Sequence, residues 1–140
     1  MKTAKELFSS EKEDGIEYAD YQPILNEFGE ILLQVDDSDY QGDSRLLYRD
    51  NNKIGYLNFG WGSCSGCDAL QACDTIEEVQ DLMDYLYNMI KWFDSKKEAL
   101  NFFNNHDWKG DYSYNEEEQI EFINKAKEIL KTYEIANDNG

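Results

Sequence analysis

A strong helix signal occupies the middle of the chain and limits the folds open to it. Thr75 and Glu78 have the spacing of a capping box, in which each side chain bonds the other residue's backbone amide. Apolar residues then recur at helical spacing: Ile76, Val79, Leu82, Met83, Leu86 and Ile90. This pattern predicts an amphipathic helix that must bury one face against another element.

Strand signals come before this helix. Apolar runs cover residues 31–35, 45–48 and 54–59, and the turn sequence Asp50-Asn51-Asn52 separates the last two runs. They predict an antiparallel meander in which Leu57 and Phe59 face the core. A short helix with Pro23 in its first turn is expected before the strands, ending at Gly29.

Two further capping boxes predict helices after the central one. Ser95 and Glu98 begin a helix that runs through Phe103, and Asn115 and Glu118 begin the last helix. The last helix is expected to bury four residues: Ile120, Ile123, Ala126 and Leu130.

The order of these elements indicates the fold class. Residues 90–93 are predicted as an additional strand, so strands dominate the first part of the chain and helices the second. This order favours an α+β fold over a doubly wound sheet. We expect one domain over residues 1–140, a short antiparallel sheet of about three to four strands packed by three to four helices, and a frayed C-terminal end.

The charge restricts the partners. The chain has 30 acidic and 13 basic residues, a net charge of −17, against a usual magnitude of roughly 2–8 for a small domain. Such a charge opposes binding to nucleic acid or anionic membranes and favours a basic protein surface or a metal ion. The chain shows no secretory signal and no apolar run long enough to span a membrane, so we expect a cytoplasmic protein.

The negative charge is concentrated. Residues 54–90 contain six acids and no lysine or arginine. On the central helix, the residues opposite the apolar face form what we call the acidic arc: Asp74, Glu77, Asp81 and Asp84. A second acidic group is expected to extend it: Asp36, Asp37, Asp39 and Asp43. We predict that these eight residues bind a basic partner; the alternative is a face that only confers solubility.

Three cysteines form the most distinctive group. Cys64 and Cys67 have the spacing that lets two sulfurs converge, Cys73 follows, and His106 is the single histidine. One interpretation is a zinc site with these four ligands. A second is a redox pair, and a third is small buried hydrophobic side chains with no cofactor. The odd cysteine count argues against a disulfide framework.

The segment from Gly60 to Cys73, GWGSCSGCDALQAC, resembles one in uncharacterised small acidic proteins of phages and mobile elements. That resemblance implies no activity. In size, charge and aromatic content the chain is similar to DNA-mimic inhibitors, including anti-CRISPR and anti-restriction proteins. The likeness shares no motif, so it implies no site residues.

These observations favour a non-enzymatic inhibitor that occupies the basic, nucleic-acid-binding surface of a partner such as a CRISPR or restriction nuclease. No phosphate-binding loop or recognisable nucleophile–base pair suggests an enzyme. An immunity protein against a toxic nuclease is the alternative within this class. A cysteine-ligated zinc or redox module is the alternative from another class.

Overall fold

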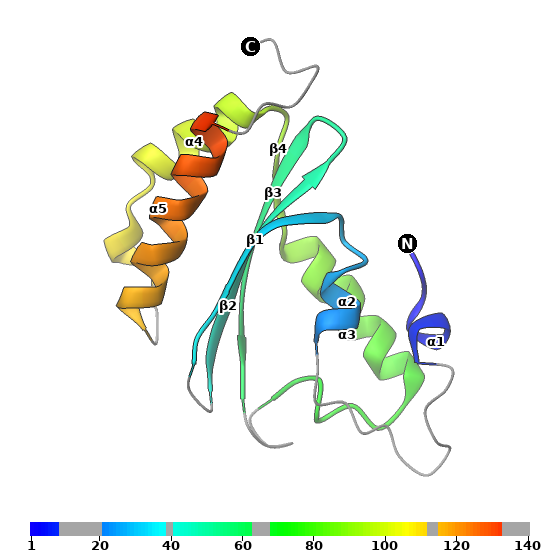
Figure 1. Cartoon of the computed structure of the whole chain (residues 1–140). Coiled ribbons are helices and arrows are strands. Elements are labelled where there is room, and N and C mark those ends of the chain that lie inside the picture. The colour runs from blue at the N-terminus through cyan, green and yellow to red at the C-terminus, as the bar shows by residue number, and fades with distance from the viewer. Residues whose placement is uncertain (9–20, 39–40, 63–67, 112–114, 133–140) are drawn as a thin grey trace.

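Four antiparallel strands form one sheet in the order β1-β2-β3-β4 in the computed structural model of the chain (Figure 1). The structure describes residues 1–8, 21–38, 41–62, 68–111 and 115–132. The strands are β1 Glu30–Asp36, β2 Gly42–Asp50, β3 Lys53–Trp61 and β4 Lys91–Phe93. The predicted α+β class is confirmed, and the predicted strand at residues 90–93 is β4.

Helices cover both faces of the sheet (Figure 1). One face carries α1 Ala4–Leu7, α2 Gln22–Leu25 and α3 Ile76–Met89. The other carries α4 Lys96–Asn105, the short 3-10 helix η1 Trp108–Gly110, and α5 Glu116–Thr132. The described residues thus contain five α-helices, where three to four were predicted. Two of the five, α1 and α2, are only four residues long.

The sheet therefore separates two hydrophobic cores. Successive side chains of a strand point to opposite faces, so Leu46 and Tyr48 of β2 enter the core under α3 while Leu47 enters the core under α4 and α5. In β3, Leu57 and Phe59 are buried in the α3 core, as predicted. Burial on both faces explains the continuous apolar run Leu46-Leu47-Tyr48 in the middle of β2.

The turns follow from local backbone preferences. Asp50 pairs with Lys53, so the hairpin between β2 and β3 closes through Asn51 and Asn52. Asn51 has a positive φ of 56°, a conformation that asparagine tolerates better than most residues. Gly29 has a φ of 151° and turns the chain from α2 into β1.

One half of each predicted capping box is present in α3 and α4, whereas the glutamate carboxylate accepts from the Thr75 hydroxyl in α3 and from Asp94 N in α4 instead of from the amide of the cap residue. The Thr75 hydroxyl accepts a hydrogen bond from Glu78 N at 3.1 Å, and the Ser95 hydroxyl accepts one from Glu98 N at 3.1 Å. Each cap satisfies a backbone amide that has no partner within its helix. At the start of α5, Asn115 Oδ1 accepts a hydrogen bond from the amide of Glu117 at 3.2 Å.

Removing the α3 cap provides a test of this assignment. Thr75→Ala is expected to lower the free energy of unfolding by about 1 kcal/mol, because the Glu78 amide loses its acceptor. Thr75→Ser retains an acceptor oxygen and serves as the matched control. Urea unfolding followed by circular dichroism measures both. Equal stability of the alanine variant and the parent would show that the cap contributes nothing.

One prediction for α5 is wrong. Ile120 is 55% exposed, whereas Ile123, Ala126 and Leu130 are buried as expected. Each helical residue advances about 100° around the axis, and the inward stripe is centred on residues 119, 123, 126 and 130. Ile120 therefore points about 100° away from Gln119, which is buried in its place.

Candidate functional site

The acidic arc lies on the solvent side of α3. Asp74 comes just before the Thr75 cap, and Glu77, Asp81 and Asp84 follow on the exposed face; all four are exposed. Gln80 Nε2 donates a hydrogen bond to Asp84 Oδ1 at 3.0 Å. Among the described residues, none of the four acids forms an ion pair with lysine or arginine. The negative charge of this face is therefore uncompensated by local pairing.

Two large apolar side chains are exposed on the same helix. Tyr85 is 63% exposed and Met89 is 39% exposed. Glu77, Asp81, Tyr85 and Met89 are spaced four residues apart and form one row along the helix. An aromatic ring next to carboxylates is typical of a contact surface, since tyrosine is enriched where proteins bind one another. Sequence reasoning missed Tyr85 and Met89, although their spacing from Asp81 was visible.

The second acidic group is divided between two sides of the sheet. Asp36 is exposed, whereas Asp37 and Asp43 are 5% and 9% exposed. The prediction that Asp37 and Asp43 belong to an exposed partner surface is therefore wrong. Asp39 lies outside the described residues.

The physical reason is a buried arginine, Arg45. Its side chain is fully buried, with Nη1 at 3.0 Å from Asp37 Oδ1 and Nη2 at 3.5 Å from Asp43 Oδ2. Asp37 Oδ2 also accepts from Asp43 N at 2.8 Å. Gly42 makes room, because a Cβ there would lie 2.6 Å from Asp37 Oδ2. We call Arg45, Asp37 and Asp43 the Arg45 cluster; its carboxylates neutralise the cation inside the protein.

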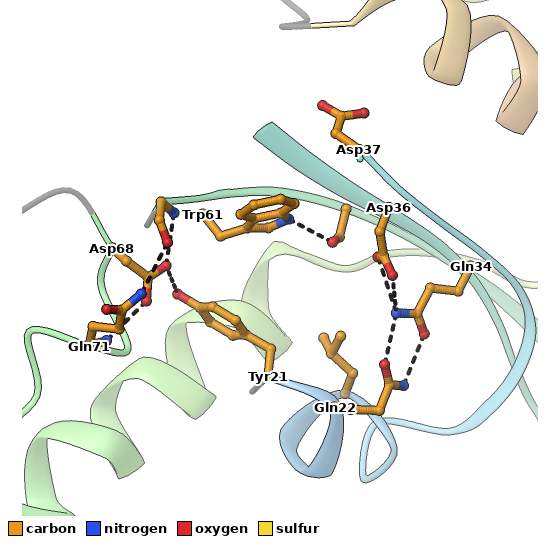
Figure 2. Close-up of a pocket in the computed structure, with 11 residues that line it drawn as sticks. Tyr21, Gln22, Gln34, Asp36, Asp37, Trp61, Asp68 and Gln71 are labelled. Carbon is orange, nitrogen blue, oxygen red and sulfur yellow. Dashed lines mark hydrogen bonds between the residues drawn. The ribbon is translucent and has the colours of Figure 1, made fainter. Parts of the chain in front are cut away.

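A pocket opens between α2, the ends of β1–β3 and the turn after Asp68, and Asp37 of the Arg45 cluster lies at its edge (Figure 2). We call it the Tyr21 pocket. It encloses about 300 Å³. The Tyr21 and Trp61 rings lie on one side of it and Asp36 and Gln34 on the other, while the Asp37 carboxylate points away (Figure 2).

Asp68 organises one wall of this pocket. Its side chain accepts hydrogen bonds from the Tyr21 hydroxyl at 2.8 Å, Gly62 N at 3.1 Å and Gln71 N at 2.9 Å. The Tyr21 hydroxyl in turn accepts from Leu70 N at 3.1 Å. Burial, together with the bond to Asp68, raises the pKa of Tyr21 well above its usual value. Tyr21 therefore remains a neutral donor that joins α2 to this turn.

Two glutamines form the opposite wall. Gln22 and Gln34 exchange a pair of side-chain amide hydrogen bonds, both 2.9 Å long. Gln34 Nε2 also lies 3.1 Å from each carboxylate oxygen of Asp36. A carboxylate accepts but does not donate, so Asp36 determines which end of the Gln34 amide faces it. Neither glutamine was singled out from the sequence, because no local pattern indicates their pairing.

The predicted zinc ligands do not come together. Cys73 is buried in the α3 core, and its thiol lies 3.3 Å from Ala69 O. His106 stacks on Phe102 at 4.8 Å on the other face of the sheet and bonds Asp111 at 2.8 Å. Zinc bonds are only about 2.0–2.3 Å long. A single site made of all four predicted ligands is therefore wrong; Cys64 and Cys67 lie outside the described residues.

The environment of Cys73 also bears on the redox interpretation. Burial raises the pKa of the Cys73 thiol, and neighbouring carboxylates, led by Glu78, raise it further. A thiol reacts as its thiolate, so this environment suppresses the reactivity of Cys73. Within the described residues, no group of three or more histidine, cysteine, aspartate or glutamate side chains is arranged to hold a metal ion.

Comparison with known proteins adds no relative. No protein-family model, curated protein or solved structure matches this chain. No helix in the described part of the chain is both long and apolar enough to cross a bilayer.

Proposed function

We propose that this protein is a non-enzymatic inhibitor that binds a basic, nucleic-acid-binding surface of a partner through the exposed face of α3. The observation that carries the proposal is the row in which Tyr85, 63% exposed, follows Asp81 and Glu77 along the helix. Solubility requires charged and polar side chains on such a face, but it does not require the exposed side chains of Tyr85 and Met89. A contact surface uses such side chains as anchors and the carboxylates around them for orientation.

Electrostatics supports a cationic partner. Each member of the acidic arc is exposed, and the chain carries a net charge of −17. Long-range attraction between this negative charge and a basic groove accelerates their encounter, and the attraction falls as salt screens it. A groove that binds a DNA duplex faces one negative charge per about 1.7 Å of helix axis. A row of carboxylates can pair with the same basic side chains of that groove.

Charge reversal on α3 tests the proposal. The partner is first captured from host lysate and identified by mass, which also separates a nuclease inhibitor from an immunity protein by the kind of enzyme recovered. Asp81→Lys with Asp84→Lys is then expected to lower the association rate about tenfold or more at low salt. Duplex DNA is expected to compete with the parent protein for the partner. Surface plasmon resonance over a range of salt concentrations measures both effects.

The matched control is a second pair of acids on another helix. Glu121 and Glu128 are exposed on α5, seven residues apart and therefore on one face; Glu121 also forms an exposed ion pair with Lys125 at 3.2 Å, a contact worth only a few tenths of a kcal/mol. Reversing both to lysine changes the net charge by the same amount as the α3 variant. If both variants lowered the association rate equally, the effect would depend on the total charge of the protein and not on the position of the acids. Unchanged association of the α3 variant would show that the acidic arc is not the binding face.

A further inference from the structure

We propose that the Tyr21 pocket receives an arginine side chain of the basic partner, with the guanidinium bound by Asp36 and stacked against Trp61. This inference rests on the proposed function, because it assumes a basic partner, and adds a second contact region apart from the acidic arc. The pocket is more than an acidic surface, since it is a cavity of about 300 Å³ with aromatic walls. That volume is at the lower end for ligand sites, which favours one side chain over a large cofactor.

Four of the side chains that line the pocket, Trp61, Tyr21, Gln34 and Gln22, already use their hydrogen-bond donors within the protein. Trp61 Nε1 donates to Ser44 Oγ at 2.8 Å, and the Tyr21 hydroxyl donates to Asp68. Gln34 Nε2 donates to both Gln22 and Asp36. Gln22 Nε2 donates to Gln34 Oε1 and to Asn26 Oδ1, at 2.9 and 3.0 Å. These side chains have no remaining N–H or O–H to offer, so a ligand that meets them must bring donors of its own.

Acceptors, in contrast, remain available. An ionised carboxylate has about four lone-pair positions, and Asp36 uses both oxygens for a single Gln34 nitrogen. The Asp36 side chain is exposed at the rim, where a second donor group can approach it. A cation with several N–H groups matches this arrangement better than a neutral or anionic ligand.

No cation of this chain neutralises the site from within, as far as the described residues show. The lining contains no lysine or arginine. The nearest arginine along β2, Arg45, points to the other face and is held by Asp37 and Asp43. Alternation along the strands thus sends Asp37 to a buried arginine while its neighbour Asp36 faces the pocket.

The aromatic walls favour arginine over lysine. The planar guanidinium stacks on aromatic rings and binds a carboxylate through two N–H groups, whereas an ammonium is compact and strongly hydrated. Trp61 is half-buried, and its indole nitrogen is held by Ser44, so the ring is fixed in place. Figure 2 shows Trp61 and Tyr21 across the pocket from Asp36, which would place the guanidinium between ring and carboxylate.

The test uses the full chain and a capped amino acid. N-acetyl-arginine amide is titrated into isotopically labelled protein, and the indole N–H resonance of Trp61 and the side-chain amides of Gln22 and Gln34 are followed. Saturable shifts of these signals are expected. N-acetyl-citrulline amide, a neutral molecule of the same shape, is expected to cause none at matched salt. Asp36→Asn is expected to weaken binding about fivefold, the effect of one exposed ion pair.

The control variant is Asp50→Asn, an exposed acid at the opposite end of β2, which is expected to bind like the parent. Shifts of equal size with citrulline, or none with arginine, would overturn the inference. Equal binding of the lysine analogue would overturn the choice of arginine. The titration requires no partner, so its failure leaves the α3 proposal standing, and failure of the charge reversal on α3 leaves this result unaffected.

Discussion

Replacing Arg45 with methionine is expected to lower the free energy of unfolding by about 3–5 kcal/mol, the cost of breaking a buried ion pair on one side. The Arg45 side chain is fully buried, and the Asp37 side chain is 1% exposed. Methionine fills similar space but leaves Asp37 as a buried charge without its cation. The measurement is equilibrium unfolding in urea, with the midpoint and slope compared to those of the parent.

A double variant separates the lost contact from the stranded charge. Asp37→Asn retains an oxygen that can accept from the Asp43 amide but removes the negative charge. Combined with Arg45→Met, it is expected to be less destabilising than the sum of the two single changes, because the partners are coupled. Strict additivity would show that Arg45 and Asp37 stabilise the fold independently. A stable Arg45→Met protein would show that the Arg45 cluster contributes little.

The Arg45 cluster also shows why the placement of the second acidic group could not be predicted. Asp36, Asp37 and Asp43 look alike in the sequence, as acids near a turn between two strands. The difference between them depends on strand register, in which Asp36 pairs with Ser44 and Val35 with Arg45. A shift of the strand register by one residue moves every side chain of the strand to the opposite face of the sheet. Composition and local spacing do not contain that information.

Local features of the fold were predictable for the opposite reason. The α3 cap, the strand at residues 91–93 and the hairpin at Asn51 depend on residues close together in the chain. The coverage of both faces of the sheet was not predicted, because it requires knowing that α4 and α5 pack on the far side. The continuous run Leu46-Leu47-Tyr48 was its sequence signal, since a strand with one solvated face alternates.

The candidate site was predictable only in part. The acidic arc lies on α3 as the helical spacing indicated, because charge and periodicity are both local properties. The Tyr21 pocket joins Tyr21, Gln34 and Trp61 from three separate segments. The zinc prediction placed Cys73 and His106 together from residue type alone, and the sheet between them separates the two.

Leu86→Ala is expected to lower the free energy of unfolding by about 2–5 kcal/mol. Leu86 is 2% exposed in the core between α3 and the sheet. Removing three carbons there loses the favourable transfer of apolar surface and leaves a cavity that the neighbours only partly fill. Thermal or urea unfolding measures the loss. If the variant were as stable as the parent, the assignment of Leu86 to the buried face of α3 would be wrong.

The residue before it provides the matched comparison. Tyr85 points to solvent from the same turn of α3, so Tyr85→Ala is expected to change stability by no more than about 0.5 kcal/mol. If Tyr85 anchors the partner, the same change is expected to weaken binding by roughly 1–2 kcal/mol or more, in the range of interface hot spots. Adjacent residues would then have opposite effects: Leu86 on folding and Tyr85 on binding. Loss of stability without loss of binding in Tyr85→Ala would reverse that assignment and remove the main support for α3 as the contact surface.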